Sequence, residues 1–179
     1  MHIFTSLTSK AIPLNMHNVD TDMIIPAQFL TKINRDGYGE HLFQYLKKQD
    51  ANFVFHDPKY QSAQILLTGA NFGCGSSREH AVWALMQAGI SVIIAESYSD
   101  IFYNNATTNG LLAITLAPTV ISRLMEEAKL GNKALTVDLQ EQTIKTVTGE
   151  TFHFNFDPFR KECFLKGQDD LDYLLEATK

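Results

Sequence analysis

Two short apolar runs, separated by a glycine-rich turn and a helical pattern, restrict most strongly the folds open to this chain. The runs Gln64-Ile-Leu-Leu67 and Val92-Ile-Ile-Ala95 are typical of buried strands. Between them, Glu79 to Ala88 predicts a helix that ends at Gly89. A connection of about two dozen residues suits a βαβ unit, in which a right-handed crossover joins two parallel strands. We therefore predict an α/β fold with a parallel strand pair.

The alternation of helices and strands continues as far as Gly131. The next predicted elements are a helix from Asp100 to Asn105, a strand from Leu111 to Thr115 and a helix from Thr119 to Lys129. The segment from Thr31 to Tyr60 is less regular, and we expect much of it to be an exposed loop around one short helix near His41 to Lys47. Long irregular loops are often functional.

After Gly131 the pattern changes to alternating apolar and polar residues, which indicates antiparallel strands. These strands are expected at Ala134–Asp138, Gln142–Val147 and Thr151–Phe156, with a hairpin turn at Thr148-Gly149-Glu150. Asp157 as N-cap and Pro158 at the first helical position then open a short helix toward Lys166. The prediction is a partly parallel sheet with flanking helices and an antiparallel C-terminal portion.

Composition limits the classes of function. A chain of 179 residues with 45% hydrophobic residues can bury one substantial core, so we expect a single domain over residues 1–179. A net charge of −5 disfavours nucleic acid and anionic membranes as partners, but leaves a small anionic ligand open. Cys74 and Cys163 have no zinc or disulfide-framework spacing, and no segment suggests a signal peptide or a membrane span. We therefore expect a cytoplasmic protein without a metal of its own.

The turn Gly69-Ala-Asn-Phe-Gly-Cys-Gly-Ser-Ser-Arg78 combines features of an anion site. Gly73 and Gly75, with Cys74 between them, can adopt positive φ and expose successive N–H groups at the start of a helix. Arg78 can add a bidentate grip on a carboxylate. Such surroundings could also support a transient serine alkoxide as a base.

A purely structural interpretation of the turn is about equally supported by its sequence. Ser76 or Ser77 could simply cap the helix, with Glu79 completing the capping arrangement. The turn lacks the Gly-Lys-Ser/Thr ending of a P-loop, the third glycine of a dinucleotide fingerprint and a Gly-x-Ser-x-Gly elbow. Earlier in the chain, Asp20 and Asp22 could bind a cation, but we favour bracing of a loop because no third ligand is evident.

Four stretches resemble one known family. These are Asn18-Val-Asp-Thr-Asp-Met-Ile-Ile-Pro-Ala-Gln-Phe-Leu30, Asn71-Phe-Gly-Cys-Gly-Ser-Ser-Arg-Glu-His-Ala81, Ser99-Asp-Ile-Phe102 and Asn109-Gly-Leu-Leu112. They are similar, in order and spacing, to the mobile swivel domain of aconitase-type hydro-lyases, and within it to the small subunits of 3-isopropylmalate dehydratases. Ala70 and Val82 depart from that pattern, where an acidic residue and a proline are expected.

The resemblance implies a swivelling β/β/α domain that is inactive alone and works with a large subunit carrying a [4Fe-4S] cluster. It implies the interconversion of 2- and 3-isopropylmalate by dehydration and rehydration in leucine biosynthesis. By position in the motif, Ser76 resembles the base, and Ser77 and Arg78 resemble groups that contact a substrate carboxylate. Lys32 or Arg35, in a loop that contributes substrate selection in related enzymes, could supply a second cation.

Two alternatives stay open at this point. One is another aconitase-type substrate, such as homoaconitate, citraconate or a dimethylmalate, which only the 29–35 loop and the partner would distinguish. The other is a stand-alone module whose turn binds an anion such as phosphate without chemistry.

Overall fold

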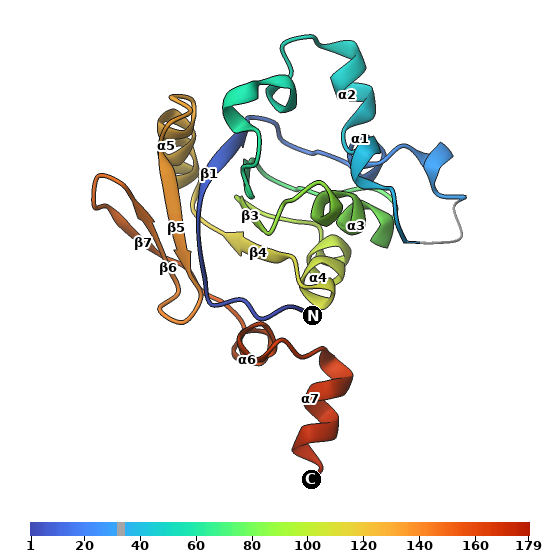
Figure 1. The fold of residues 1–179 in the computed structure, drawn as a ribbon, viewed down its shortest axis with the longest axis vertical. Coiled ribbons are helices and arrows are strands. Elements are labelled where there is room, and N and C mark those ends of the chain that lie inside the picture. Colours follow the sequence, from blue (N-terminus) through green and yellow to red (C-terminus); the bar gives the residue numbers. More distant parts are fainter. Residues whose placement is uncertain (32–34) are drawn as a thin grey trace.

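The computed structural model describes residues 1–31 and 35–179, which build one seven-stranded mixed sheet with helices on both faces (Figure 1). The strand order is β4-β3-β2-β1-β5-β6-β7. The strands are β1 (Ser6–Leu14), β2 (Ile65–Thr68), β3 (Val92–Ala95), β4 (Leu112–Thr115), β5 (Ala134–Asp138), β6 (Thr143–Thr146) and β7 (Thr151–His153). The helices are α1 (Thr21–Ile24), α2 (Gln44–Gln49), α3 (Glu79–Gln87), α4 (Asp100–Asn109), α5 (Pro118–Ala128), α6 (Pro158–Lys166) and α7 (Asp170–Ala177).

β1 divides the sheet into a parallel and an antiparallel half. Its first residues, Ser6 to Lys10, pair antiparallel with β5, and Ala11 to Leu14 pair parallel with β2. β2, β3 and β4 are parallel to one another, and β5, β6 and β7 form an antiparallel meander. The predicted α/β class, with its partly parallel sheet and antiparallel C-terminal portion, is confirmed.

The parallel strands are buried on both faces, which explains their continuous apolar sequences. Side chains such as Leu66 and Ile93 point into a core shared with α1, α3 and α4. Their neighbours Ile65 and Ile94 point to the opposite face, where α5, α6 and the meander cover them. This alternation fixes α3 and α4 on one side of the sheet, so the glycine turn and the start of α4 meet at the carboxyl ends of the strands.

The region from Thr31 to Tyr60 follows its prediction in part. Its described part contains short 3-10 turns and α2, which begins at Gln44 after Phe43 in the left-handed region at φ 53°. Many of its aromatic and aliphatic side chains are buried rather than exposed, including Tyr38, Leu42, Phe43, Phe53 and Tyr60. About half of the described residues of this region are exposed, and α2 overlaps the predicted short helix, but the buried side chains also make the region part of the core.

β1 and α7 were not among the predicted elements. α7 extends away from the body, with Leu171, Leu174 and Leu175 all more than half exposed (Figure 1). In the described parts of the chain, no helix is long and apolar enough to cross a membrane.

Candidate active site

The glycine turn lies against the segment that follows β1. The backbone N–H of Gly73 donates to the carbonyl of Val19 at 2.8 Å, and the N–H of Thr21 donates to the carbonyl of Cys74 at 2.9 Å. The Thr21 hydroxyl donates to the carbonyl of Ser76 at 2.9 Å. Two stretches that are far apart in the sequence therefore form one backbone unit.

The other side of the turn is bound by the loop that leads into α4. The N–H of Phe72 donates to the carbonyl of Ser97, and the N–H of Ser99 donates back to the carbonyl of Phe72, each at 3.1 Å. The Ser99 hydroxyl donates to the carbonyl of Gly73 at 2.9 Å and also accepts the N–H of Phe102, as the N-cap of α4. The turn is thus held between α1 and α4.

Gly73 and Gly75 both have positive φ, at 79° and 91°, as predicted. At Gly73 a Cβ would also lie 2.2 Å from Cγ of Phe102, so both the backbone and its surroundings exclude a side chain. At Gly75 a Cβ would meet its nearest neighbour at 3.4 Å, so there only the backbone conformation favours glycine. These glycines determine how the chain reaches Ser76.

The turn borders a cavity of about 300 Å³. It is lined by Thr21, Gly73, Gly75, Ser76, Ser77, Arg78, Ser99, Asp100, Ile101 and Phe102. Ser76 and Ser77 are exposed, and within residues 1–31 and 35–179 neither hydroxyl has a hydrogen-bond partner. The structure therefore brings both serines and Arg78 to one cavity, with two hydroxyls open to a ligand.

Arg78 is held in place by an ion pair between its Nη1 and Oδ1 of Asp22. The guanidinium side chain is only 16% exposed, whereas that of Asp22 is 59% exposed. Asp20 has a different role, since its carboxylate accepts the N–H of Met23 at 2.8 Å and caps α1. Both carboxylates brace the site, as expected, and Asp22 is a partner for Arg78 that sequence reasoning did not identify.

The alternative that Ser76 or Ser77 caps α3 is wrong. The N-cap of α3 is Arg78, in an extended conformation, and it makes no side-chain cap hydrogen bond. A helix start without a capping side chain leaves backbone N–H groups available to an anion.

Asn109, the last residue of α4, joins that helix to α3. The side-chain NH2 group of Asn109 donates to Oε1 of Glu79 at 2.9 Å. The side-chain Oδ1 of Asn109 accepts the indole N–H of Trp83 at 3.2 Å. The motif that begins at Asn109 therefore has a structural role in fixing the first turns of α3.

The structure tests only one of the two loop cations against this cavity. Lys32 lies outside the described residues. Arg35 does not line the cavity, and its guanidinium carbon lies 4.8 Å from the centre of the Trp83 ring. Their assignment to substrate binding stays a prediction.

Tyr98 pairs with Phe72 of the turn in an isolated parallel β-bridge. Its hydroxyl lies within hydrogen-bond distance of the carbonyl oxygens of Ile93 and Ile114, at 3.0 and 2.8 Å. Burial of this hydroxyl raises the pKa of Tyr98 well above its usual range, so the group stays neutral and acts as a structural donor.

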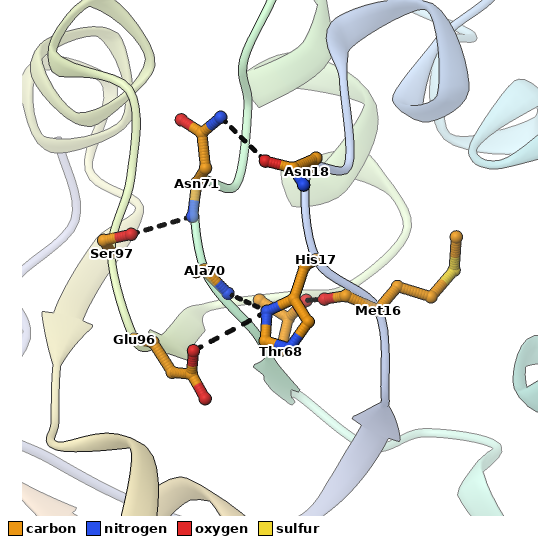
Figure 2. A network of polar contacts seen from close by, with 8 residues as sticks. All are labelled: Met16, His17, Asn18, Thr68, Ala70, Asn71, Glu96 and Ser97. Atoms are coloured by element: carbon orange, nitrogen blue, oxygen red, sulfur yellow. Dashed lines mark hydrogen bonds and ion pairs between the residues drawn. The ribbon is translucent and has the colours of Figure 1, made fainter.

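A polar network that sequence reasoning missed holds the first residues of the turn (Figure 2). Asn71 donates its side-chain amide to Oδ1 of Asn18 at 3.0 Å and its backbone N–H to the Ser97 hydroxyl at 2.8 Å. His17 accepts the N–H of Ala70 at 2.8 Å. No spacing in the sequence indicates these contacts, because the loops that meet here follow three different strands.

A second cavity, of about 850 Å³, lies among the 3-10 turns and the end of α3. Its lining is mixed in charge, with Asp36, Glu40 and Asp57 as well as Lys47 and His56. None of the serines, the arginine or the glycines of the turn reaches it. Size alone does not make it the reactive site, because the groups with candidate chemistry gather at the smaller cavity.

Comparisons with known proteins match nearly the whole chain. The family described as Aconitase C-terminal domain matches residues 1–119, and a family described as LeuD_N matches residues 122–158. A 3-isopropylmalate dehydratase small subunit from Francisella philomiragia subsp. philomiragia is 56% identical over 98% of this chain and 93% of its own length. One from Cereibacter sphaeroides, strain KD131, is 48% identical over 99% of this chain and 92% of its own length.

A solved structure is similar along nearly the whole chain. It is a crystal structure of a 3-isopropylmalate dehydratase from Methanocaldococcus jannaschii, with a TM-score of 0.72 and 27% sequence identity. The match covers 97% of this chain and 95% of that one.

Proposed function

Because this chain belongs to the aconitase-type family of 3-isopropylmalate dehydratase small subunits, we propose that its glycine turn supplies the base and part of the carboxylate site of that hydro-lyase. The reaction interconverts 2-isopropylmalate and 3-isopropylmalate through isopropylmaleate, in leucine biosynthesis. The observation that carries the proposal is the 300 Å³ cavity that joins Arg78 to the two serine hydroxyls, which have no partner among the described residues. Residues 1–179 act in it as one swivel domain.

Ser76 is the proposed base. Its alkoxide takes the proton from the substrate carbon that is deprotonated during dehydration, and the serine hydroxyl returns that proton during rehydration. The positive charge of Arg78 and the uncapped start of α3 both favour the anionic form of the serine oxygen. The hydroxyl formed during dehydration is the proton donor for rehydration, so Ser76 Oγ ends the cycle as the alkoxide with which it began.

Ser77 and Arg78 hold a carboxylate of the substrate. A guanidinium carries five N–H donors in a planar fork, and Asp22 engages the Nη1 end. The remaining donors can bind a carboxylate while Asp22 keeps the fork in its orientation. We extend the proposal to Lys32 and Arg35 as further cations for the second carboxylate, supplied by the loop between α1 and α2.

The chain needs a partner for the remaining chemistry. Among the described residues, no group of three or more His, Cys, Asp or Glu side chains could hold a metal ion, and Cys74 and Cys163 lie in different elements. The small-subunit family implies a large-subunit partner. We propose that this partner binds a [4Fe-4S] cluster, which supplies Lewis-acid chemistry at the leaving hydroxyl.

Anaerobic reconstitution with the cognate large subunit tests the function. Isopropylmaleate formation from 3-isopropylmalate is followed by absorbance for the mixture and for each subunit alone, with homoaconitate as the competing substrate. Turnover of 3-isopropylmalate by the mixture alone is the expected result. Turnover of homoaconitate only would contradict the substrate, and silence with an intact cluster would contradict the reaction.

Ser76→Ala tests the base in the same mixture. Its kcat should fall by about 10²–10⁴-fold, the usual contribution of general acid–base catalysis, while assembly is unchanged. Ser122→Ala, which removes an exposed hydroxyl from α5, is the matched control. Near-normal turnover by Ser76→Ala would rule the base out.

Arg78→Lys tests the carboxylate site. Lysine keeps the charge but loses the planar fork, so KM should rise by roughly tenfold or more while kcat changes less. A fall in kcat with unchanged KM would assign Arg78 to the chemical step instead.

A further inference from the structure

One nitrogen of His17 faces two groups that cannot both bind it in the same protonation state. His17 lies between β1 and α1, and its Nδ1 accepts the backbone N–H of Ala70 at 2.8 Å. Glu96 follows β3, and its Oε2 lies 3.6 Å from the same Nδ1. Figure 2 shows both contacts converging on this ring nitrogen.

The chemistry of imidazole makes the two contacts exclusive. A ring nitrogen accepts an N–H only when it carries no proton, so the bond from Ala70 requires neutral His17 with its proton on Nε2. In the imidazolium form Nδ1 carries a proton and becomes a donor, for which the Glu96 carboxylate is the available acceptor. Protonation therefore exchanges the partner at Nδ1 and leaves the Ala70 N–H without its acceptor.

The absence of a side chain at Gly69 leaves space for the His17 ring. A Cβ at Gly69 would lie 2.4 Å from the Nδ1 of His17 and 2.6 Å from the carbonyl oxygen of Met16, so only glycine leaves room for the imidazole. The His17 side chain is 57% exposed and that of Glu96 is 16% exposed. The ring can thus exchange protons with solvent while the carboxylate stays close beneath it.

The Ala70 N–H lies where the glycine turn begins. The carbonyl of Ala70 accepts the N–H of Asn18 at 2.9 Å, and the following Asn71 is tied to Asn18 and Ser97. The same turn continues to Ser76. A shift of the Ala70 backbone is therefore passed along residues 70–76, because the hydrogen bonds of Asn71 hold the opposite side of this stretch in place.

We propose that His17 is a positioning residue for Ser76, and that it forms a protonation-dependent latch with Glu96 at the start of the glycine turn. Neutral His17 holds the Ala70 N–H and keeps the turn in its reactive geometry. Protonated His17 turns to Glu96 and loosens the turn. This inference rests on the proposed function for its effect on turnover, but the latch itself can be observed without turnover.

The charges around the ring favour this assignment. In the described chain, the segments against His17 are the ends of β1 and β2 and the loop after β3. The polar groups that they bring to the ring are the Ala70 N–H and the Glu96 carboxylate, while the Thr68 hydroxyl donates to the Met16 carbonyl. Glu96 is the charged group among these, so it is the partner that the imidazolium gains.

Nuclear magnetic resonance of the full chain tests the latch directly. The imidazole ¹⁵N signals should show the Nε2–H form of His17 at high pH, and the Ala70 amide signal should follow the titration of His17. In His17→Asn, whose side-chain oxygen can accept the same N–H but does not titrate, the Ala70 signal should stay constant. An Nδ1–H form at high pH, or an Ala70 signal that ignores the His17 titration, would overturn the latch.

The pH profile of the reconstituted enzyme tests the positioning role. As the pH falls from about 8 to 5, the range in which histidine side chains change charge, kcat should fall more than KM rises. The part due to the latch should be roughly fivefold, the factor that one hydrogen bond typically contributes. His17→Asn should remove this part, and Glu96→Gln should reduce it.

His153→Asn, at an exposed histidine on β7, is the matched control and should leave the profile unchanged. An acid loss of kcat that is the same in His17→Asn as in the unmodified chain would refute the positioning role. If no mixture turns over isopropylmalate, the proposed function fails, while the resonance measurement still decides on the latch.

Discussion

At Gly73 the backbone and the neighbouring ring both exclude a side chain. The residue has φ 79°, and a Cβ there would overlap Phe102. Gly149, in the hairpin between β6 and β7, also has positive φ, but a Cβ there would meet nothing within 4 Å. Replacing each glycine by alanine therefore distinguishes two contributions to stability. One is the strain of a left-handed backbone, and the other is steric overlap with a neighbouring side chain.

Gly73→Ala should lower the free energy of unfolding by about 2–4 kcal/mol, since a left-handed backbone and overpacking both contribute. Gly149→Ala should cost only about 1–2 kcal/mol, from the backbone alone. Urea unfolding, monitored by the fluorescence of Trp83, measures both. Equal losses in the two variants would show that Phe102 moves aside and that crowding is not what requires glycine in the turn.

Residues close in sequence could be assigned from their pattern, but partners from distant segments could not. The positive φ of Gly73 and Gly75 follows from the spacing of glycines before a helix. The ion pair between Asp22 and Arg78 joins positions that no local pattern relates. The family resemblance predicted that Ser76, Ser77 and Arg78 lie at one site. The hydrogen bonds that hold the turn could be identified only from the structure.

At the scale of elements, α6 and α7 both have an aspartate as N-cap, but only α6 has buried residues. Asp157 caps α6, accepting the N–H of Arg160 at 3.0 Å, and α6 buries Cys163 and Phe164. Asp169 caps α7 through a capping box, but α7 has no buried residue.

Asp157→Ala should therefore destabilise the whole protein by about 1 kcal/mol, the usual worth of an N-cap. Asp169→Ala should loosen α7 but leave global unfolding within about 0.5 kcal/mol, because fraying of a helix without buried residues exposes no core. Urea midpoints measure the first effect, and helical circular dichroism before the transition measures the second. A global loss in Asp169→Ala as large as that in Asp157→Ala would show that α7 packs on the body.

Elements with continuous apolar sequences were predictable, and β1 was not. β2, α3 and β3 lie within a residue or two of their predicted bounds. β1 contains polar residues and Pro13, and its burial changes from alternating to complete halfway along. That change arises because different strands cover its two halves, which a single stretch of sequence does not reveal.

Over the whole molecule, stability should be distributed unevenly. β2 and β3 are buried at every position and lie inside the sheet, whereas α7 contributes nothing to either core. Hydrogen exchange should therefore be slowest in these two strands, where amides open only with global unfolding, and fastest in α7. Mass spectrometry of proteolytic fragments measures this order. Protection of α7 equal to that of β3 in the isolated chain would contradict it.

The division of the sheet into parallel and antiparallel halves was predictable from the change of pattern at Gly131, but the strand order was not. Nothing local indicates that the first strand lies in the middle. Its place depends on pairing with β5, whose residues are more than a hundred positions away.

The central position of β1 also affects how the chain folds during synthesis. Ser6 to Lys10 leave the ribosome before the other strands of the sheet, but their partners in β5 are made only after the whole parallel half. Until then the nascent domain presents an open strand edge, which can pair with other chains. The last strands of the sheet therefore complete the fold and also end a period in which the growing chain is exposed to aggregation.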